Sequence, residues 1–261
     1  MKYFKFGENW RSFSSLIDND RLNYSIKSIK KLTNKKNLKN LSFLDIGCGS
    51  GLSSLAAIKL HCRELYAIDR DENSVETTKK VLWNFQKKKV KIEKLSVFDL
   101  DENNKFDIVF SWGVLHHTGN MKKAIEKSTK MVSKGGLLII SLYKKTFLCS
   151  FWKIEKIIYK SSPVFIQKII KLVFMGFFSL GLLLTKRNLS SYKLDYKNQR
   201  GMSFSHDVHD WLGGYPYESI SVEDTIKILK SHNFKLVRCF QVKKRIGFFG
   251  TGCDEYVFIK S

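Results

Sequence analysis

The stretch Leu44-Asp45-Ile46-Gly47-Cys48-Gly49-Ser50-Gly51 decides the fold of this 261-residue chain. Apolar residues over 41–46 predict a buried strand. Glycine at every second position after it predicts a sharp turn, since glycine adopts the backbone conformations that such turns need. The apolar positions of 52–60 then predict a helix. The N–H groups at the start of that helix would face the turn, which is the arrangement of a nucleotide-binding unit.

The chemistry of this turn indicates a ligand with a positive charge. A dinucleotide site shows G-x-G-x-x-G and holds a pyrophosphate, whereas the spacing here is G-x-G-x-G with Asp45 just before it. That carboxylate would repel an anion, and it suits a cationic amino group. A nucleotide site of another kind is the alternative interpretation of the glycine pattern.

The chain around this turn alternates between strand and helix patterns, which is typical of βαβ units and a parallel sheet. The segment 243–252 is short and predicts a hairpin, so one of the last two strands should run antiparallel. We expect strands over 41–46, 65–68, 90–95, 106–110, 137–142, 234–240 and 255–259, and helices over 52–60, 74–85, 121–132 and 222–232. The expected parts are an N-terminal helical cover (1–40), a cofactor-binding core (41–142), a helical cap for the substrate (143–221) and the C-terminal helix and strands of the core (222–261).

Two more of the expected strands end in side chains that suit an adenosine. Asp69 ends the second strand, where a carboxylate can accept hydrogen bonds from both ribose hydroxyls. Phe98 and Asp99 follow the third strand and can pack against an adenine ring and bind its exocyclic amine. With Asp45, these residues call for a ligand that has adenine, ribose and an amino-acid tail.

Four runs of the sequence resemble class I S-adenosylmethionine-dependent methyltransferases, and more narrowly the polyprenyl-hydroxyphenyl (ubiquinone-pathway) methylases. They are LDIGCGSG (44–51), AIDRD (67–71), VFD (97–99) and FDIVFSWGVLHH (106–117). The resemblance implies a Rossmann-like α/β fold with a seven-stranded sheet of order 3-2-1-4-5-7-6, strand 7 antiparallel and helices on both faces. It implies S-adenosyl-L-methionine as the cofactor and no metal.

The same resemblance assigns the cofactor-binding residues by motif position. Asp45, Gly47 and Gly49 should line the methionine part, and Asp69 the ribose. Phe98 and Asp99 should hold the adenine. The remaining expected contacts are Cys48, Gly51 and Arg70 beside these motifs, and Ser111 and Trp112 next to the sulfonium.

Candidate catalytic bases are histidines. His116 and His117 follow the fourth strand, whose carboxyl end faces the ligand crevice in open α/β sheets. An imidazole is a suitable base for a hydroxyl nucleophile, and His117 is the stronger candidate because members of the resembled family often place a histidine there. His206 is a third candidate, within a cluster with Asp207, His209 and Asp210. That cluster could also bind a metal or simply fix the cap.

The outer regions supply candidate substrate contacts. Trp211, Tyr215 and Tyr217 suit the walls of a pocket, and Arg200 could clamp a carboxylate or phosphate. The runs 6–10, 200–203 and 210–218 are similar to a methyltransferase subgroup for which no substrate is established. The candidate contacts are Trp10, Arg200, His209, Trp211, Tyr215 and Tyr217.

An apolar run over 172–184 stands out in the expected cap. It is shorter than the roughly 20 residues of a membrane-spanning helix. A buried cap helix is one interpretation. Membrane contact through 150–185, or the wall of a lipid-sized pocket, is the other. Lysines alternate with apolar residues just upstream, which is typical of a basic amphipathic segment.

The net charge of +22 and the five cysteines restrict the possible partners and the cellular compartment. The charge indicates a nucleic-acid or anionic membrane partner, or only lysine-rich surface filling. The cysteine count is odd and lacks C-x-x-C, and no apolar signal core begins the chain, so we expect a cytoplasmic protein, with membrane association open. The sequence favours methyl transfer to a small, apolar or lipid-like molecule, most simply at a hydroxyl. An RNA methyltransferase and a non-catalytic cofactor-binding subunit are the alternatives.

Overall fold

A computed structural model describes residues 4–85, 89–184, 186, 188–242 and 252–261, with the side chains of 197–200 left aside. Its sheet has seven strands in the order β3-β2-β1-β4-β5-β7-β6. The pairs among the first five strands are parallel, whereas β7 runs antiparallel to β5 and to β6, which confirms the expected topology. The strands are β1 (Ser42–Ile46), β2 (Glu64–Asp69), β3 (Val90–Lys94), β4 (Phe106–Trp112), β5 (Val132–Tyr143), β6 (Phe234–Phe240) and β7 (Cys253–Lys260).

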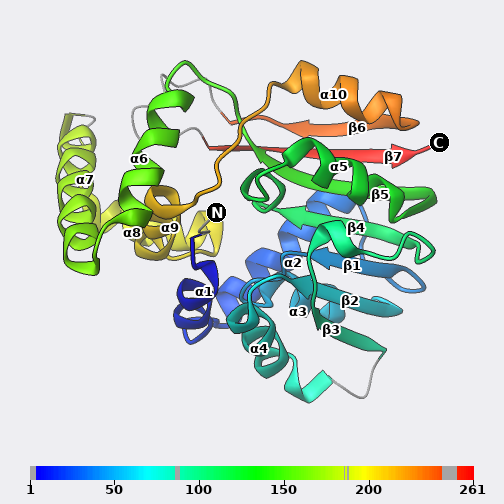
Figure 1. Cartoon of the computed structure of the whole chain (residues 1–261). Helices are drawn as coiled ribbons and strands as arrows, with labels where there is room; N and C mark the ends of the chain where they lie inside the picture. Colours follow the sequence, from blue (N-terminus) through cyan, green and yellow to red (C-terminus); the bar gives the residue numbers. More distant parts are fainter. Residues whose placement is uncertain (1–3, 86–88, 185, 187, 243–251) are drawn as a thin grey trace.

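Helices cover both faces of the sheet (Figure 1). Successive side chains of a strand point to opposite faces, so Phe43 packs with one layer of helices and Leu44 with the other. Both side chains are fully buried, which explains the nearly unbroken apolar run of β1. The first layer holds α2 (Asn19–Thr33), α3 (Leu52–Lys59) and α4 (Glu72–Val81), and the second holds α5 (Met121–Lys130) and α10 (Val222–Ser231).

A helical cap follows β5 and lies beyond the carboxyl ends of the parallel strands, together with α1 (Phe6–Ser14) (Figure 1). Its own small core is made of aromatic and aliphatic side chains such as Tyr159, Tyr196 and Phe204. The cap therefore has an apolar interior separate from that of the sheet. It consists of α6 (Cys149–Ser161), α7 (Val164–Leu184), α8 (Leu189–Arg200) and α9 (Phe204–Gly213).

The apolar run of the cap is longer and more exposed than a buried helix would be. Helix α7 has 21 residues and is, among the described helices, the one long and apolar enough to cross a membrane by length and composition. Leu182 is its one fully buried described residue. The interpretation of 172–184 as a buried cap helix is wrong, because only one face of α7 packs on the cap.

Candidate functional site

A cavity of about 1470 Å³ opens between the carboxyl ends of the strands, α1 and the cap. The sheet supplies its polar end, and the cap supplies an aromatic end. Fourteen of the residues expected from the sequence line it: Trp10, Asp45, Gly47, Cys48, Gly49, Asp69, Arg70, Phe98, Asp99, Trp112, His116, His117, Trp211 and Tyr217.

The glycine turn after β1 is shaped by two close approaches. Gly47 has a φ of +78°, and a Cβ added there would lie 2.4 Å from a methyl carbon of Val114. Gly49 has a φ of +53°, and the indole of Trp10 lies at 3.4 Å from where its Cβ would stand. Both positions combine a left-handed conformation with a close neighbour, so only glycine fits them without strain. The turn thus brings bare backbone to the cavity.

Two buried carboxylates face the cavity beside this turn. Asp45 accepts a hydrogen bond from Ser54 Oγ at 2.6 Å, and burial raises its pKa to about 7 against the lowering effect of Ser54. Asp69 accepts from the N–H groups of Gly49 (3.1 Å) and Asp71 (2.9 Å), yet burial still raises its pKa to about 6. Desolvated carboxylates gain most from a cation. The site therefore fits the positively charged cofactor that the sequence implied.

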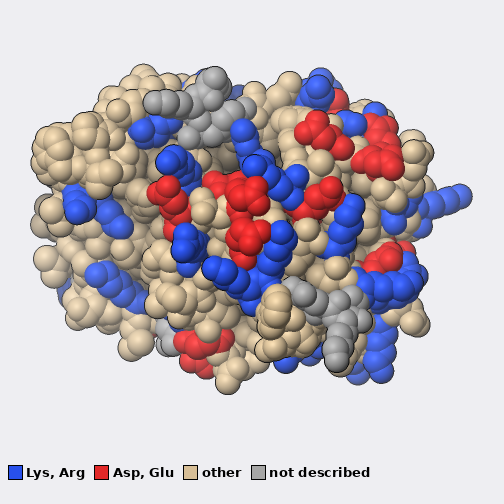
Figure 2. Space-filling model, turned by 60° about the horizontal axis from the view of Figure 1, so that its bottom comes forward, with Lys and Arg blue, Asp and Glu red and all other residues tan. Residues whose placement is uncertain are grey.

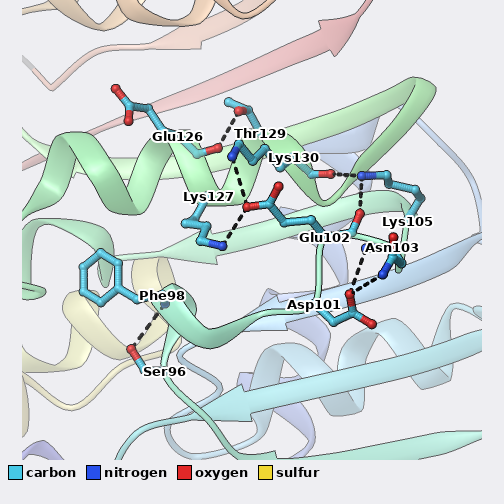
Figure 3. Close-up of polar contacts among 10 residues, drawn as sticks. All are labelled: Ser96, Phe98, Asp101, Glu102, Asn103, Lys105, Glu126, Lys127, Thr129 and Lys130. Atoms are coloured by element: carbon cyan, nitrogen blue, oxygen red, sulfur yellow. Dashed lines mark hydrogen bonds and ion pairs between the residues drawn. The ribbon is translucent and has the colours of Figure 1, made fainter.

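A short 3₁₀ helix, η2 (Val97–Asp99), presents the residues expected at the adenine. The N–H of Phe98 donates to Ser96 Oγ at 3.3 Å (Figure 3). The following loop is tied to α5, since Lys127 Nζ lies 2.7 Å from a Glu102 carboxylate oxygen. The Phe98 ring points away from that ion pair in Figure 3. These contacts hold η2 at the cavity edge.

Two of the expected cofactor contacts lie outside the cavity lining. The Ser111 hydroxyl is buried and donates to the carbonyl of Ile46 at 3.2 Å, so it links β4 to β1. Gly51 is the residue before the first turn of α3 and has a φ of +77°. Trp112 does line the cavity, and its Nε1–H donates to Glu255 at 2.8 Å. Ser111 and Gly51 therefore support β4 and the glycine turn, whose neighbouring residues line the cavity.

The two histidines of η3 (Leu115–His117) line the cavity with different hydrogen-bonding states. His117 Nδ1 lies 2.7 Å from the carbonyl oxygen of Pro216. A carbonyl can only accept, so Nδ1 carries the proton and Nε2 of the neutral ring keeps its lone pair. Burial lowers the pKa of His117 to about 4 despite the Pro216 carbonyl, with Lys156 lowering it further. His117 is therefore a neutral imidazole with a basic nitrogen at neutral pH.

His116 has the opposite tautomer. Its Nδ1 accepts from the backbone N–H of Tyr143 at 3.3 Å, so the proton sits on Nε2. That Nε2 is buried and has no hydrogen-bond partner among the described residues. Burial, together with His117 and Lys156, holds the pKa of His116 well below 6.5. The His116 ring therefore lies at the cavity wall with its Nε2–H buried, whereas His117 carries its lone pair on Nε2.

Aromatic rings enclose this histidine pair. The Tyr143 ring lies 4.0 Å from His116 and 5.4 Å from His117, centroid to centroid, and Phe6 lies 4.9 Å from His117. Tyr143 ends β5 and Phe6 begins α1. Tyr143 of the sheet therefore covers the histidine pair on one side, and Phe6 of the N-terminal helix covers it on the other.

The cap end of the cavity is aromatic with one buried ammonium group. Lys156 is 3% exposed, and its Nζ donates to the carbonyl of Trp211 and lies 5.0 Å from the Tyr217 ring centre. Burial lowers its pKa to about 8, which Glu155 partly offsets. The aromatic walls are formed by Trp152, Phe174, Phe178, Tyr192, Tyr196, Trp211 and Tyr217. We call the space between these walls the aromatic chamber, and its lining suits a flat or lipid-like apolar molecule.

The structure separates the expected His–Asp cluster into two groups. Asp207 and Asp210 line the cavity, where Tyr196 and Asn9 hold them by hydrogen bonds. His206 and His209 instead line a separate small depression of about 270 Å³. They lie on another side of α9, since residues 206 and 207 of one helix cannot share a face. Among the described residues no group of three side chains forms a metal site.

The interpretation of His206 as a catalytic base is wrong for this geometry. Its ring contacts the hydroxyls of Ser203 (2.8 Å) and Ser12 (3.2 Å), and it lies outside the main cavity. His209 contacts the Tyr159 hydroxyl at 2.8 Å and is likewise outside. Tyr215, an expected substrate contact, is buried beside the cavity without lining it. The side chain of Arg200 lies outside the described residues.

Sequence reasoning missed Tyr143 and Lys156 as site residues, whereas Asp207 and Asp210 belong to the cluster that it singled out. Tyr143 follows from strand position, since β5 is parallel to β4 and ends at the same edge. Lys156 follows from helical spacing, because Trp152, Lys156 and Tyr159 share one buried face of α6. The helical spacing alone therefore distinguishes Lys156 from the exposed residues of α6.

Comparisons with known sequences agree with this geometry. Residues 37–171 match the family described as a methyltransferase domain, just over half of the chain. The ubiquinone biosynthesis O-methyltransferase of Pelagibacter ubique is 32% identical over 123 residues, 46% of this chain and 50% of that protein. Its counterpart in Rickettsia prowazekii is 30% identical over 153 residues, 56% of this chain and 58% of that protein. The chain thus spans about half the length of these curated relatives.

Solved structures share the fold. Magnesium protoporphyrin IX methyltransferase of Synechocystis, with bound SAM, has a TM-score of 0.55 at 14% identity, covering 93% of this chain and 80% of that one. PKMT2 of Rickettsia typhi, in complex with AdoHcy, has a TM-score of 0.60 at 17% identity, covering 91% of this chain and 52% of that one. At such identities the similarity extends to the fold alone.

Proposed function

Because this chain belongs to the methyltransferase-domain family and is a class I S-adenosylmethionine-dependent methyltransferase, we propose that it methylates a hydroxyl of an apolar or lipid-like small molecule. The observation that carries the proposal is the place of His117. It lines the same cavity as the carboxylates of the sheet end and the aromatic side chains of the cap. Ubiquinone biosynthesis O-methyltransferases among the relatives support a hydroxyl as the acceptor.

When bound, S-adenosylmethionine supplies an electrophilic methyl group on a sulfonium sulfur. In our proposal Asp45 and Asp69 hold its amino and ribose groups, and Phe98 and Asp99 its adenine. His117 would accept the hydroxyl proton at Nε2 while the methyl group passes from sulfur to the acceptor oxygen, and the Pro216 carbonyl would keep Nδ1 protonated.

The aromatic chamber decides the acceptor class. Trp152, Phe174 and Tyr217 give it apolar walls, and the buried ammonium group of Lys156 attracts electron-rich oxygen. A folded RNA has no matching feature on the face in Figure 2, where Lys and Arg are scattered with acidic side chains between them. A small apolar acceptor therefore fits the chamber better than a nucleic acid.

The test uses methyl-labelled S-adenosylmethionine and purified protein in a cell extract that is afterwards separated into lipid, polar small-molecule, protein and RNA fractions. We expect label in the lipid or small-molecule fraction, and none with the His117→Asn variant. Label in RNA would support an RNA methyltransferase instead. Cofactor binding by calorimetry without label in any fraction would support a cofactor-binding subunit that needs a partner.

A further inference from the structure

Over the described residues 164–184, the outer face of α7 is an apolar surface with a single lysine on it. Leu172 is 71% exposed, Phe177 64% and Leu184 81%. These positions recur at helical spacing on the side of α7 that is turned away from the cap. Lys168 is the one charged side chain on this face among the described residues. The apolar members are Val164, Phe165, Ile169, Leu172, Val173, Phe177, Leu180, Leu183 and Leu184.

Helix α6 extends this surface. It packs beside α7, and its exposed positions are mostly apolar, with Ile154 60% exposed and Lys153 as a basic exception. The loop before it exposes Phe147 almost completely. Phe151, Ile157 and Ile158 complete this strip. A contiguous apolar area of this kind marks an interaction surface rather than ordinary exposure. We call the outer faces of α6 and α7, with Phe147, the apolar face.

The charges around the apolar face have one sign. Residues 144–196 contain ten Lys and Arg but only two acidic residues, Glu155 and Asp195. Neither acid is presented on the apolar face, since the Glu155 carboxylate is buried and Asp195 lines the cavity. Figure 2 shows the end of the molecule that carries α7, at the left, as mostly uncharged, with basic but no acidic side chains between the apolar ones. Apolar side chains framed by lysines suit an anionic lipid surface.

The inner face of α7 fixes how the helix would meet a bilayer. Phe174 and Phe178 line the cavity, and Phe178 packs 5.1 Å from the Phe204 ring. Lys171 Nζ donates to the carbonyl and hydroxyl of Ser205 at 2.9 and 3.0 Å. A helix held on the cap along one side cannot cross a membrane by itself, so it would lie in the interface plane with its outer face in the lipid.

We propose that the apolar face docks the enzyme on an anionic lipid bilayer, so that α7 separates the acceptor chamber from the lipid by a single helix. The docking is independent of the methyl acceptor. Its consequence rests on the proposed function: an acceptor dissolved in the bilayer reaches the cavity past α7 without crossing water.

The experiment measures sedimentation of the purified full chain with vesicles, without cofactor or acceptor. We expect binding to vesicles that contain phosphatidylglycerol, weaker binding to phosphatidylcholine alone, and a reduction on adding salt. The double variant Leu172→Glu and Phe177→Glu should bind at least about tenfold more weakly. Trp83→Glu is the matched control, because Trp83 is equally exposed (70%) but lies near β3 on the sheet domain. It should bind as the wild type does.

Each other outcome overturns the proposal. Equal losses in the double variant and in Trp83→Glu would mean a general loss of charge attraction rather than insertion of the apolar face. Wild-type binding by the double variant would place the contact elsewhere. A dimer by analytical ultracentrifugation that dissociates in the double variant, without vesicle binding by the wild type, would assign the apolar face to a second copy of the chain. Circular dichroism shows whether each variant is folded, and a milder pair, Leu172→Ser and Phe177→Ser, replaces one that is not.

Discussion

At the scale of single residues, the site works through groups whose charge state is set by burial. Asp45 and Asp69 are desolvated carboxylates next to bare backbone, and His117 is a desolvated imidazole with its proton fixed on Nδ1. Each is held away from its ordinary pKa in the direction that favours the neutral form. A positively charged cofactor reverses this for the carboxylates, which ties binding to pH.

Cofactor affinity should rise with pH between about 5 and 8. Burial raises the pKa of Asp69 to about 6 and that of Asp45 to about 7, and a bound cation favours their ionised forms, so binding releases protons. The gain approaches about tenfold per pH unit for each proton released. Calorimetry at pH 6.5 in two buffers of different ionisation enthalpy measures that release directly. Identical heats in both buffers would contradict it, and Asp69→Asn should bind weakly with a smaller release.

The His117→Asn variant should lose about 10²–10⁴-fold in turnover. The amide of asparagine can still donate to the Pro216 carbonyl, but no basic nitrogen remains, so cofactor affinity should not change. Initial rates with a labelled methyl donor and calorimetry check the two parts. His206→Asn is the control and should keep wild-type turnover, because His206 lies outside the cavity. Equal losses in both variants would exclude His117 as the specific base.

At the scale of elements, α1 acts as the cover over the glycine turn. Trp10 packs on Gly49, and the N–H of Gly7 donates to Asp71 Oδ2 at 3.2 Å. The other oxygen of Asp71 accepts from the N–H of Asn73 and caps α4. The Asp71 carboxylate thus binds α1 and also caps α4. The position of α1 over the glycine turn and the start of α4 beside Asp69 therefore depend on each other.

A single methyl group at Gly7 should loosen this cover. The Cβ of Gly7→Ala would lie 2.1 Å from Asp71 Oδ1, so that carboxylate must leave its capping position. We expect no net gain in unfolding free energy, because the loss of the cap, about 1 kcal/mol, offsets what the helix gains from alanine, and weaker cofactor binding because Trp10 moves. Urea denaturation and calorimetry measure both. Gly176→Ala is the control, since no atom lies within 4 Å of its Cβ position, and a helix gains stability from alanine. Unchanged affinity in Gly7→Ala would show that α1 does not cover the cofactor.

The sheet and its edge could be read from the sequence, but the cap could not. The strands follow from the alternation of elements and from long apolar runs such as 43–46, which strands buried on both faces leave, whereas their order is what the resemblance to the methyltransferase family implied. The apolar run of α7 carries no periodic polar signal, so its burial depends on partners that sequence spacing does not give. His206 and His209 are adjacent in sequence to Asp207 and Asp210, which line the cavity. Their side chains lie on another side of α9, and the sequence alone does not show which side faces the cavity.

At the scale of the whole molecule, the buried titratable groups act on stability in opposite directions. His116 and His117 have lowered pKa values, so the stability that depends on them is complete above about pH 6.5 and is lost as the pH falls. Asp45 and Asp69 have raised pKa values, so their contribution is lost as the pH rises through about 6 and 7. In the protein without cofactor these two contributions therefore largely offset each other between about pH 4 and 7.

The part of the unfolding free energy that depends on His117 should fall between pH 6.5 and 4. The pKa of His117 alone, lowered to about 4, corresponds to as much as about 3 kcal/mol. Urea denaturation at pH 7 and pH 4.5 measures the loss in the wild type and in His117→Asn, and the loss should be smaller in the variant. An equal loss would mean that other groups carry the acid sensitivity.

The cap begins and ends at neighbouring points of the sheet. Lys144 and Ile220 form a bridge, and the N–H of Ile220 donates to the carbonyl of Tyr143 at 3.0 Å. The chain therefore leaves and re-enters the core at one place, as an inserted unit does. Asp45, Asp69 and the glycine turn lie before this place in the sequence, and most of the aromatic wall lies within the insertion. Recombination could exchange the cap as one continuous segment. That exchange would change which acceptor binds, while the cofactor-binding part of the chain stays the same.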